Sequence, residues 1–316
     1  MEIGAASVNC KSRKIIKKMP ESWWVGAACP GEMYITRNFG NKRLRFKALA
    51  VNGIDRYHVL MKRPFKTKRK HNENASGSQC DRIFGIHAVS AALSNPQRKI
   101  RLLYATQNGL NRLSEVVDTD NYSTVEVTSQ DLSRRLGHDS VHQGVLIEAD
   151  PLPAPELDVL ATNLAPASPL LVLDQVTDPH NVGAILRSAA TFNAAAVIMT
   201  RRNSPPLDGV LAKAASGAVE HVPIVLVTNL ARALADLGQM GIQTIGLDGD
   251  ANEALETTQL QMPSALVLGS EGKGLRRLTA ENCDILCCLT TTGPLRSLNV
   301  SNATAVALHT LAMRAK

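Results

Sequence analysis

Aromatic residues are scarce, at 3% of the 316 residues. Residues 81–316 contain only four of them, namely Phe84, Tyr104, Tyr122 and Phe192. Domains that bind single-stranded RNA by stacking bases need a row of exposed aromatic side chains. A base-stacking platform is therefore not expected here, and any bound RNA should be recognised by its shape, its phosphates and its ribose 2′-hydroxyls.

Long uncharged hydrophobic runs are also missing, so no membrane-spanning segment is expected although 44% of the residues are hydrophobic. The six cysteines form no CxxC pair and have no histidine partner at the spacing of a zinc site. Cys283, Cys287 and Cys288 surround an apolar run, where a free cysteine behaves as a small hydrophobic residue. We therefore expect a soluble protein of the reducing cytoplasm that holds no metal.

Acidic residues are nearly absent from the first quarter of the chain. Residues 1–80 carry 17 Lys and Arg against 5 Asp and Glu, whereas residues 81–316 carry 18 against 23. The run 62–70 has six basic residues and no acidic one, followed by a polar stretch, so residues 1–80 should form a basic extension without ordered structure. Such a run either binds phosphate backbones without reading sequence or only keeps the protein soluble.

Residues 1–60 show no hydrophobic periodicity, and two interpretations stay open for them. They form a targeting peptide, because such segments are basic and poor in acid. Alternatively Met61 is the native start, and the preceding residues come from an over-long reading frame. We favour the second, because Met61-Lys62-Arg63-Pro64 opens a familiar kind of basic tail. Residues 1–60 should then be dispensable for folding and activity.

Residues 81–150 have the pattern of a small α/β unit. Strands are expected at 100–105, 124–127 and 144–149, and helices at 86–93, 110–117 and, with Ser129 as its cap, up to residue 136. Five prolines then mark residues 151–168 as a stiff linker with one helical turn at 157–164.

From residue 169 to the end, strands and helices alternate, which predicts a mainly parallel sheet covered on both faces. The last helix should run over 299–314. The strands are expected at 170–173, 196–199, 222–227, 242–247, 265–268 and 284–289. Small residues make up much of the inner stripe of that last helix, Val300, Ala303, Ala307 and Leu311, which favours close packing.

The stretch 174–188 follows the first of these strands and carries the first candidate site. Asn181 is expected to cap a helix that runs to about residue 193. Arg187 lies six residues later, a rise of roughly 9 Å, but helical side chains lean back toward the N-terminus. The two side chains either converge on one ligand, or Asn181 only caps the helix and Arg187 is solvated.

Glycine-rich turns after strands favour a nucleotide-like ligand at the carboxyl ends of the sheet. The spacing of Gly269, Gly272 and Gly274 is G-x-x-G-x-G, which differs from the dinucleotide fingerprint, and no Ser or Thr follows Lys273 as a P-loop requires. Residues 248–259 imitate a calcium loop, but Glu253 stands where that loop needs glycine.

Three motifs resemble, in order, those of the SpoU/TrmH family of RNA ribose 2′-O-methyltransferases. They are N-x-G-x-x-x-R at 181–187, L-G-x-E-G-x-G-L at 268–275 and S-L-N-V-S-N-A at 297–303. Within the family, the sequence is most similar to the bacterial enzymes that methylate a guanosine of 23S ribosomal RNA. The resemblance covers residues 81–316.

The resemblance implies a knotted, SPOUT-type catalytic domain at 169–316, preceded by a smaller ribosomal-protein-L30e-like domain at 81–150 that binds RNA. The resemblance to the L30e-like domain rests on residues 84–89 and 142–144. It also implies a homodimer assembled through the catalytic domain, with ribosomal RNA as the partner and no metal. The cofactor is S-adenosylmethionine, held by the backbone at Gly269, Leu289 and Leu298. The family's Ile-Pro is replaced here by Leu289-Thr290, which alters the adenine slot but keeps its apolar residue.

The resemblance also assigns roles in the reaction. Arg187 acts on the ribose hydroxyl, and because a guanidinium is very hard to deprotonate, we expect it to bind the adjacent phosphate and stabilise the developing oxyanion rather than act as a base. Asn181 and Ser297 orient the ribose, while Glu271 holds the loops and Asn299 caps the last helix. A structural role for the last two is equally compatible with the pattern.

Two other functions remain open at this point. A transfer-RNA ribose methyltransferase would share the same motifs, although the additional domain at 81–150 favours ribosomal RNA. A non-catalytic RNA-binding homologue belongs to a different class. The intact Asn181, Arg187 and Ser297 count against it.

Overall fold

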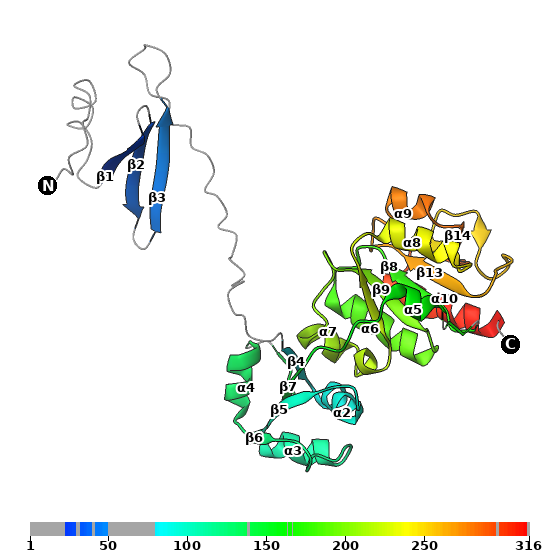
Figure 1. Cartoon of the computed structure of the whole chain (residues 1–316), viewed down its shortest axis with the longest axis horizontal. Helices are drawn as coiled ribbons and strands as arrows, with labels where there is room; N and C mark the ends of the chain where they lie inside the picture. Colours follow the sequence, from blue (N-terminus) through cyan, green and yellow to red (C-terminus); the bar gives the residue numbers. More distant parts are fainter. Residues whose placement is uncertain are drawn as a thin grey trace. The chain divides into compact units, whose positions relative to one another are not determined.

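The computed structural model describes residues 23–29, 32–39, 42–49 and 80–314, except 138–139, 163, 166 and 295–296. The chain forms two compact units, Met1–Ser76 and Gly77–Lys316 (Figure 1). Met61 and the basic run 62–70 lie outside the described residues, so the predictions about them stay predictions.

Three strands form an antiparallel sheet in the first unit, in the order β1-β2-β3. They are β1 (Trp23–Cys29), β2 (Glu32–Phe39) and β3 (Lys42–Leu49). This differs from the expectation that residues 1–80 lack ordered structure. The signal was a period of two in residues 43–47, where Arg43, Arg45 and Lys47 alternate with Leu44 and Phe46. The many charged residues in this stretch make the hydrophobic alternation hard to recognise in the sequence.

The small domain at the start of the second unit is a four-stranded sheet with three helices. The strand order is β4 (Asp81–Phe84), β7 (Val145–Ala149), β5 (Ile100–Ala105) and β6 (Thr124–Glu126). The helices are α2 (Ile86–Ser94), α3 (Gln107–Ser114) and α4 (Ser129–Leu136). The predicted α/β character of this region is confirmed, whereas β4 was not predicted.

Two helix starts in this domain differ from the prediction, because capping threonines precede them. Thr106 Oγ1 accepts a hydrogen bond from the backbone N–H of Gly109 at 3.0 Å, so α3 begins three residues earlier than expected. Thr128, and not Ser129, caps α4, and it forms a reciprocal capping box with Asp131.

The larger domain, from residue 169 to the end of the described chain, is built on a seven-stranded sheet in which every strand pair is parallel. The strand order is β10 (Ile224–Val227), β9 (Ala196–Thr200), β8 (Leu170–Leu173), β13 (Ser264–Leu268), β11 (Gln243–Leu247), β14 (Ile285–Cys288) and β12 (Glu253–Ala254). The parallel sheet is confirmed, and the two-residue β12 is an addition to it. The knot stays a prediction from the resemblance.

Helices cover both faces of this sheet (Figure 1). They are α5 (Leu157–Thr162), α6 (Pro179–Thr191), α7 (Gly209–Ala214), α8 (Leu230–Gln239), α9 (Arg277–Glu281), α10 (Val300–Arg314) and the 3₁₀ helix η1 (Ala218–Glu220). Leu171 of β8 packs in the core that contains Ile185 of α6, while its neighbour Leu170 packs in the core that contains Leu234 of α8. Burial on both faces explains the uninterrupted apolar run of β8.

The start of α6 corrects one sequence prediction. Asp178, and not Asn181, is the N-cap residue, and its carboxylate accepts the backbone N–H of His180 at 3.0 Å. Pro179 occupies the first helical position, where its missing N–H costs no hydrogen bond. Asn181 therefore lies inside the first turn, and its side chain is available for another contact.

Among the described residues, no helix has the length and hydrophobicity needed to cross a membrane.

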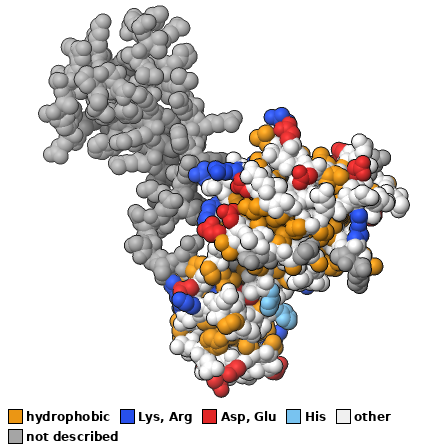
Figure 2. Space-filling model, turned by 45° about the vertical axis from the view of Figure 1, so that its right-hand side comes forward, with side chains coloured by type: hydrophobic (Ala, Val, Ile, Leu, Met, Phe, Trp, Pro, Cys, Tyr) orange, Lys and Arg blue, Asp and Glu red, His pale blue; other side chains and the backbone are white. Residues whose placement is uncertain are grey.

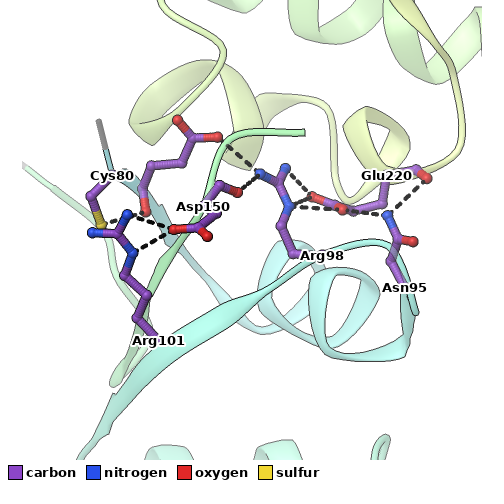
Figure 3. A network of polar contacts seen from close by, with 7 residues as sticks. Cys80, Asn95, Arg98, Arg101, Asp150 and Glu220 are labelled. Carbon is purple, nitrogen blue, oxygen red and sulfur yellow. Dashed lines mark hydrogen bonds and ion pairs between the residues drawn. The ribbon is translucent and has the colours of Figure 1, made fainter. Parts of the chain in front are cut away.

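Packing joins the small domain to the larger domain, in addition to the linker. Ala212 of α7 lies in the hydrophobic core of the small domain. Arg98, just before β5, is sandwiched between acidic groups: its Nη2 lies 2.6 Å from Glu220 of η1 and its Nη1 lies 2.9 Å from Asp81. Arg98 and Glu220 side chains are 1% and 2% exposed, and Asn95 donates a further hydrogen bond to Glu220 (Figure 3). The junction is therefore a buried polar network.

Candidate active site

Three side chains from three separate motifs meet at one edge of the sheet. Asn299 Nδ2 donates to Asn181 Oδ1 at 3.1 Å and to Glu271 Oε2 at 3.4 Å. Asn181 Nδ2 in turn donates to Glu271 Oε2 at 3.3 Å. We call these three residues the amide–carboxylate cluster. Each motif identified in the sequence contributes one member.

The sheet topology brings these motifs together. β8 and β13 are neighbouring parallel strands, with Leu173 paired to Leu268, so the loops that follow them leave the sheet at the same edge. The first loop leads to Asn181 in α6, and the second carries Glu271. Helix α10 packs in the same core as α6, which places Asn299, the residue before α10, beside Asn181.

A tight glycine turn presents Glu271 at this edge. Ser270 and Gly274 exchange backbone hydrogen bonds of 3.1 and 2.9 Å across the turn. A Cβ atom at Gly269 would collide with the backbone of Gly274, and Gly272 and Gly274 have φ angles of +79° and +63°. The glycines of this motif are therefore needed to build the turn itself, besides any role in contacting a ligand.

A buried ion pair makes a second connection between the same two loops. The side chain of Asp174, directly after β8, is fully buried. It accepts Arg276 Nε at 2.7 Å and the backbone N–H of Arg276 at 3.0 Å. The sequence patterns did not predict this pair, because its members are 102 residues apart. The available signal was a carboxylate placed directly after a fully apolar strand, where an unpaired charge would be costly.

Asn299 uses its two amide atoms for different purposes. Its Oδ1 accepts the backbone N–H of Ser301 at 2.8 Å and the Ser301 hydroxyl at 2.6 Å, which is the geometry of a helix cap at the start of α10. Its Nδ2 makes the contacts within the amide–carboxylate cluster. Capping and site formation are therefore combined in one side chain.

Arg187 and Ser297 lie outside the cluster. The side chain of Arg187 is exposed on α6 and makes no hydrogen bond or ion pair with a described residue, so its convergence with Asn181 on one ligand stays a prediction. Ser297 is also exposed. Gly183, the glycine of the same motif, lies against α7, where an added Cβ would be 2.5 Å from the Cβ of Ala214. The motif glycine is thus explained by helix packing.

The three residues expected to hold S-adenosylmethionine lie in or near this edge. Gly269 directly follows β13 and Leu289 directly follows β14, and both strands pair with β11, so both residues leave the sheet on the same side. Leu298, next to Asn299, keeps 44% of its surface exposed, and Leu289 packs partly on the core. Backbone groups beside an uncovered apolar side chain fit a cofactor with an adenine ring. Within the described residues, no group of three or more His, Cys, Asp or Glu residues is placed to hold a metal ion.

Two sequence families match the chain. The SpoU rRNA Methylase family matches residues 168–309, which contain the amide–carboxylate cluster. The RNA 2′-O ribose methyltransferase substrate-binding family matches residues 82–155, the small domain.

Curated relatives extend over both domains. The 23S rRNA (guanosine-2′-O-)-methyltransferase RlmB of Pseudomonas aeruginosa is 39% identical over 237 residues, which cover 73% of this chain and 95% of that protein. The protein of the same name from Pasteurella multocida is 41% identical over 244 residues, covering 72% of this chain and 96% of that protein.

Solved structures agree with this fold. A TrmH-family protein from Porphyromonas gingivalis is similar with a TM-score of 0.62 and 27% identity, covering 75% of this chain and 90% of that chain. The SpoU methyltransferase AviRb of Streptomyces viridochromogenes, solved in complex with AdoMet, has a TM-score of 0.63 over 74% of this chain and 89% of that one. Its 21% identity supports the fold alone. The chain belongs to the SpoU rRNA methylase family. It combines the catalytic domain of that family with a substrate-binding domain in front of it.

Proposed function

We propose that the protein transfers a methyl group from S-adenosylmethionine to the ribose 2′-hydroxyl of a guanosine in 23S ribosomal RNA. The amide–carboxylate cluster carries this proposal, because Asn181, Glu271 and Asn299 bring all three motifs of the family to one place. Relatives named for this reaction are 39% and 41% identical to the chain over both domains, which supports the choice of substrate.

The side chains at this edge have distinct roles in the proposed reaction. Bound S-adenosylmethionine supplies an electrophilic methyl group. Asn181 and Ser297 orient the target ribose, and Glu271 holds the two amides in place. The side chain of Arg187 is exposed and has no partner among the described residues, so it is free to contact the neighbouring phosphate and the developing oxyanion. A guanidinium gives up a proton too reluctantly to serve as a general base near neutral pH.

We further propose that the enzyme acts in the cytoplasm as a homodimer, without a metal and without a membrane partner. Helix α10 supports the dimer, because Val306 and Met313 on it are 44% and 56% exposed, while its buried side is formed by Val300, Thr304, Ala307, Leu308 and Leu311. A dimer through the catalytic domain would cover these apolar side chains. Light scattering at micromolar concentration should give twice the chain mass of 34.0 kDa. A monomer would contradict this part of the proposal.

Methyl transfer to purified RNAs tests the function directly. The full chain is incubated with S-adenosylmethionine that carries a labelled methyl group, and with unmodified 23S ribosomal RNA or unmodified transfer RNA. Label in the 23S RNA, located on a guanosine ribose, supports the proposal. Label only in transfer RNA would establish the alternative substrate. Label in neither RNA, together with RNA binding, would identify a non-catalytic homologue.

A further inference from the structure

A basic cleft lies at the same sheet edge as the amide–carboxylate cluster but has different lining residues. Its volume is about 570 Å³, and it opens beyond the carboxyl ends of β8, β9 and β10, with the start of α9 as its other wall. Three arginines and three amide side chains line it: Arg202, Arg276, Arg277, Gln175, Asn203 and Asn229. None of its twelve lining residues is Asp or Glu. The cleft lining therefore offers hydrogen-bond donors and three guanidinium groups, two of which, those of Arg276 and Arg277, have acidic partners outside the lining.

This concentration of positive charge stands out against the rest of the domain. Residues 169–316 contain 11 Lys and Arg against 12 Asp and Glu, so the domain as a whole is slightly acidic. The face drawn in Figure 2 shows acidic and basic side chains interspersed with uncharged ones, without a continuous basic surface. Three of the 11 cations nevertheless line this cleft, and Arg201 precedes the first of them. An anionic ligand is thus attracted to a specific place rather than to a general basic surface.

The buried ion pair described above fixes one of the three guanidinium groups. Asp174 accepts hydrogen bonds from the Nε and the backbone N–H of Arg276, yet 48% of the Arg276 side chain stays exposed. Its orientation is therefore set before any ligand binds, while part of the group remains accessible. A planar guanidinium held in this way is suited to two-pronged hydrogen bonding with a phosphate.

The other two arginines are exposed and can adapt to a ligand. Arg277 has an 81% exposed side chain and an ion pair with Glu281 at 2.9 Å. The side chain of Arg202 makes no hydrogen bond or ion pair with a described residue, and its backbone carbonyl accepts the Thr200 hydroxyl at 2.5 Å. The loop after β9 is thereby anchored while the guanidinium stays free.

The cleft and the amide–carboxylate cluster are built on the same two loops. Gln175 lines the cleft in the loop that leads from β8 to Asn181, and Arg276 lies five residues after Glu271. An RNA strand whose target ribose lies at the cluster has to leave the site past one of these loops. We propose that the basic cleft binds the phosphate backbone of the substrate RNA strand next to the methylated nucleotide. This inference rests on the proposed function. The cleft holds the strand without reading its sequence, because phosphate contacts carry no base information.

The double variant Arg202→Gln/Arg277→Gln tests the cleft, because neither residue is paired with a buried acid. Kinetics of methyl transfer to 23S ribosomal RNA should show KM raised by about tenfold with kcat nearly unchanged. The slope of log Kobs for RNA against log[salt] should become shallower by about 0.7–0.9 for each phosphate that the variant no longer binds. Arg232→Gln is the matched control, since Arg232 is exposed on the neighbouring α8 but does not line the cleft.

The outcomes separate this inference from the proposed function. Suppose that the wild type methylates the RNA, and that the double variant has the same KM and the same salt slope as both the wild type and Arg232→Gln. The cleft is then not an RNA site. If the wild type shows no methyl transfer, the salt slopes still decide, because they require binding alone. The single variant Arg202→Gln, which removes no internal contact, gives the answer should the double variant fold poorly. Inorganic phosphate or guanosine monophosphate at millimolar concentration can be added as a competitor of substrate RNA. If either competes as well as unlabelled RNA does, the assignment is overturned, since the cleft would then be a small-anion site.

Discussion

Asn181 and Asn299 are 118 residues apart in the sequence, yet Asn299 Nδ2 donates to Asn181 Oδ1 at 3.1 Å. The same Asn299 side chain caps α10 through its Oδ1. These two uses can be separated by substitution, because aspartate keeps the oxygen that caps and loses the amide that donates.

Asn299→Asp should therefore keep α10 capped but lose methyl transfer, since a carboxylate would face both Asn181 Oδ1 and Glu271. Asn299→Ala should lose activity as well and also lower the free energy of unfolding by about 1 kcal/mol, the typical value of a cap. Urea unfolding and methyl-transfer rates on the same samples distinguish the effects. Full activity of the aspartate variant would show that Asn299 only caps the helix.

Arg187→Ala should reduce kcat by about 100- to 1000-fold, the effect of removing one preorganised oxyanion partner in other enzymes. Affinity for S-adenosylmethionine should change little, because the proposed cofactor contacts are the backbone groups of Gly269, Leu289 and Leu298 and do not include Arg187. Arg187→Lys should restore little activity, since a point charge does not reproduce a planar two-pronged contact. Titration calorimetry and single-turnover rates provide the two measurements. Near-normal turnover of the alanine variant at saturating RNA would mean that Arg187 is only a solvated helix residue.

The buried pair of Arg98 and Glu220 should hold the small domain against the catalytic domain (Figure 3). Arg98→Met leaves Glu220, whose side chain is 2% exposed, without its cation, and should lower the free energy of unfolding by about 3–5 kcal/mol. Adding Glu220→Gln removes the more deeply buried of the two charges that lose their cation, the other being Asp81, and should recover a measurable part of that loss. Denaturant titration of the three proteins tests this. A double variant no more stable than Arg98→Met would show that the buried charge is not the cause.

The stability of the small domain should depend on pH through His142. Burial, with a smaller contribution from the charge of Lys213, lowers the pKa of this imidazole below its usual 6.5. The folded state holds it neutral, with Nδ1 accepting the backbone N–H of Gly144 at 3.1 Å. As pH falls through 6.5, the unfolded chain takes up this proton before the folded chain does.

Folding should therefore lose up to about 1.4 kcal/mol per pH unit from this group until the lowered pKa is reached. His142→Asn keeps a side-chain acceptor but does not titrate. The difference in unfolding free energy between wild type and this variant should shift in favour of the variant between pH 7 and pH 5. A difference independent of pH would show that His142 titrates normally.

The strands and helices of the catalytic domain could be predicted from the sequence, because each depends on a pattern of residues that are close together in the chain. The apolar runs that became β8, β9 and β13 are buried on both faces, so they needed no alternation to be recognised. Errors arose where two capping residues competed, as when Asp178-Pro179 began α6 ahead of Asn181. A proline after a capping residue is the stronger signal of a helix start.

The polar contacts of the folded protein could not be found in this way. Arg98 and Glu220 are separated by 122 residues, and Asp174 and Arg276 by 102, so no spacing rule relates them. Asn181, Glu271 and Asn299 were selected through the resemblance of their motifs, and only the sheet order explains why they meet. The basic cleft is of the same kind, because its three arginines come from two distant loops.

Mapping of ribose methylation in cellular RNA tests the central proposal most directly. Total RNA is compared between a strain that lacks the gene, the same strain supplied with the wild-type gene, and the strain supplied with the Arg187→Ala form. The proposed function predicts that one 2′-O-methylguanosine of 23S ribosomal RNA is missing in the first, restored in the second and nearly absent in the third. An unchanged methylation map of both ribosomal and transfer RNA in the deletion strain would contradict it.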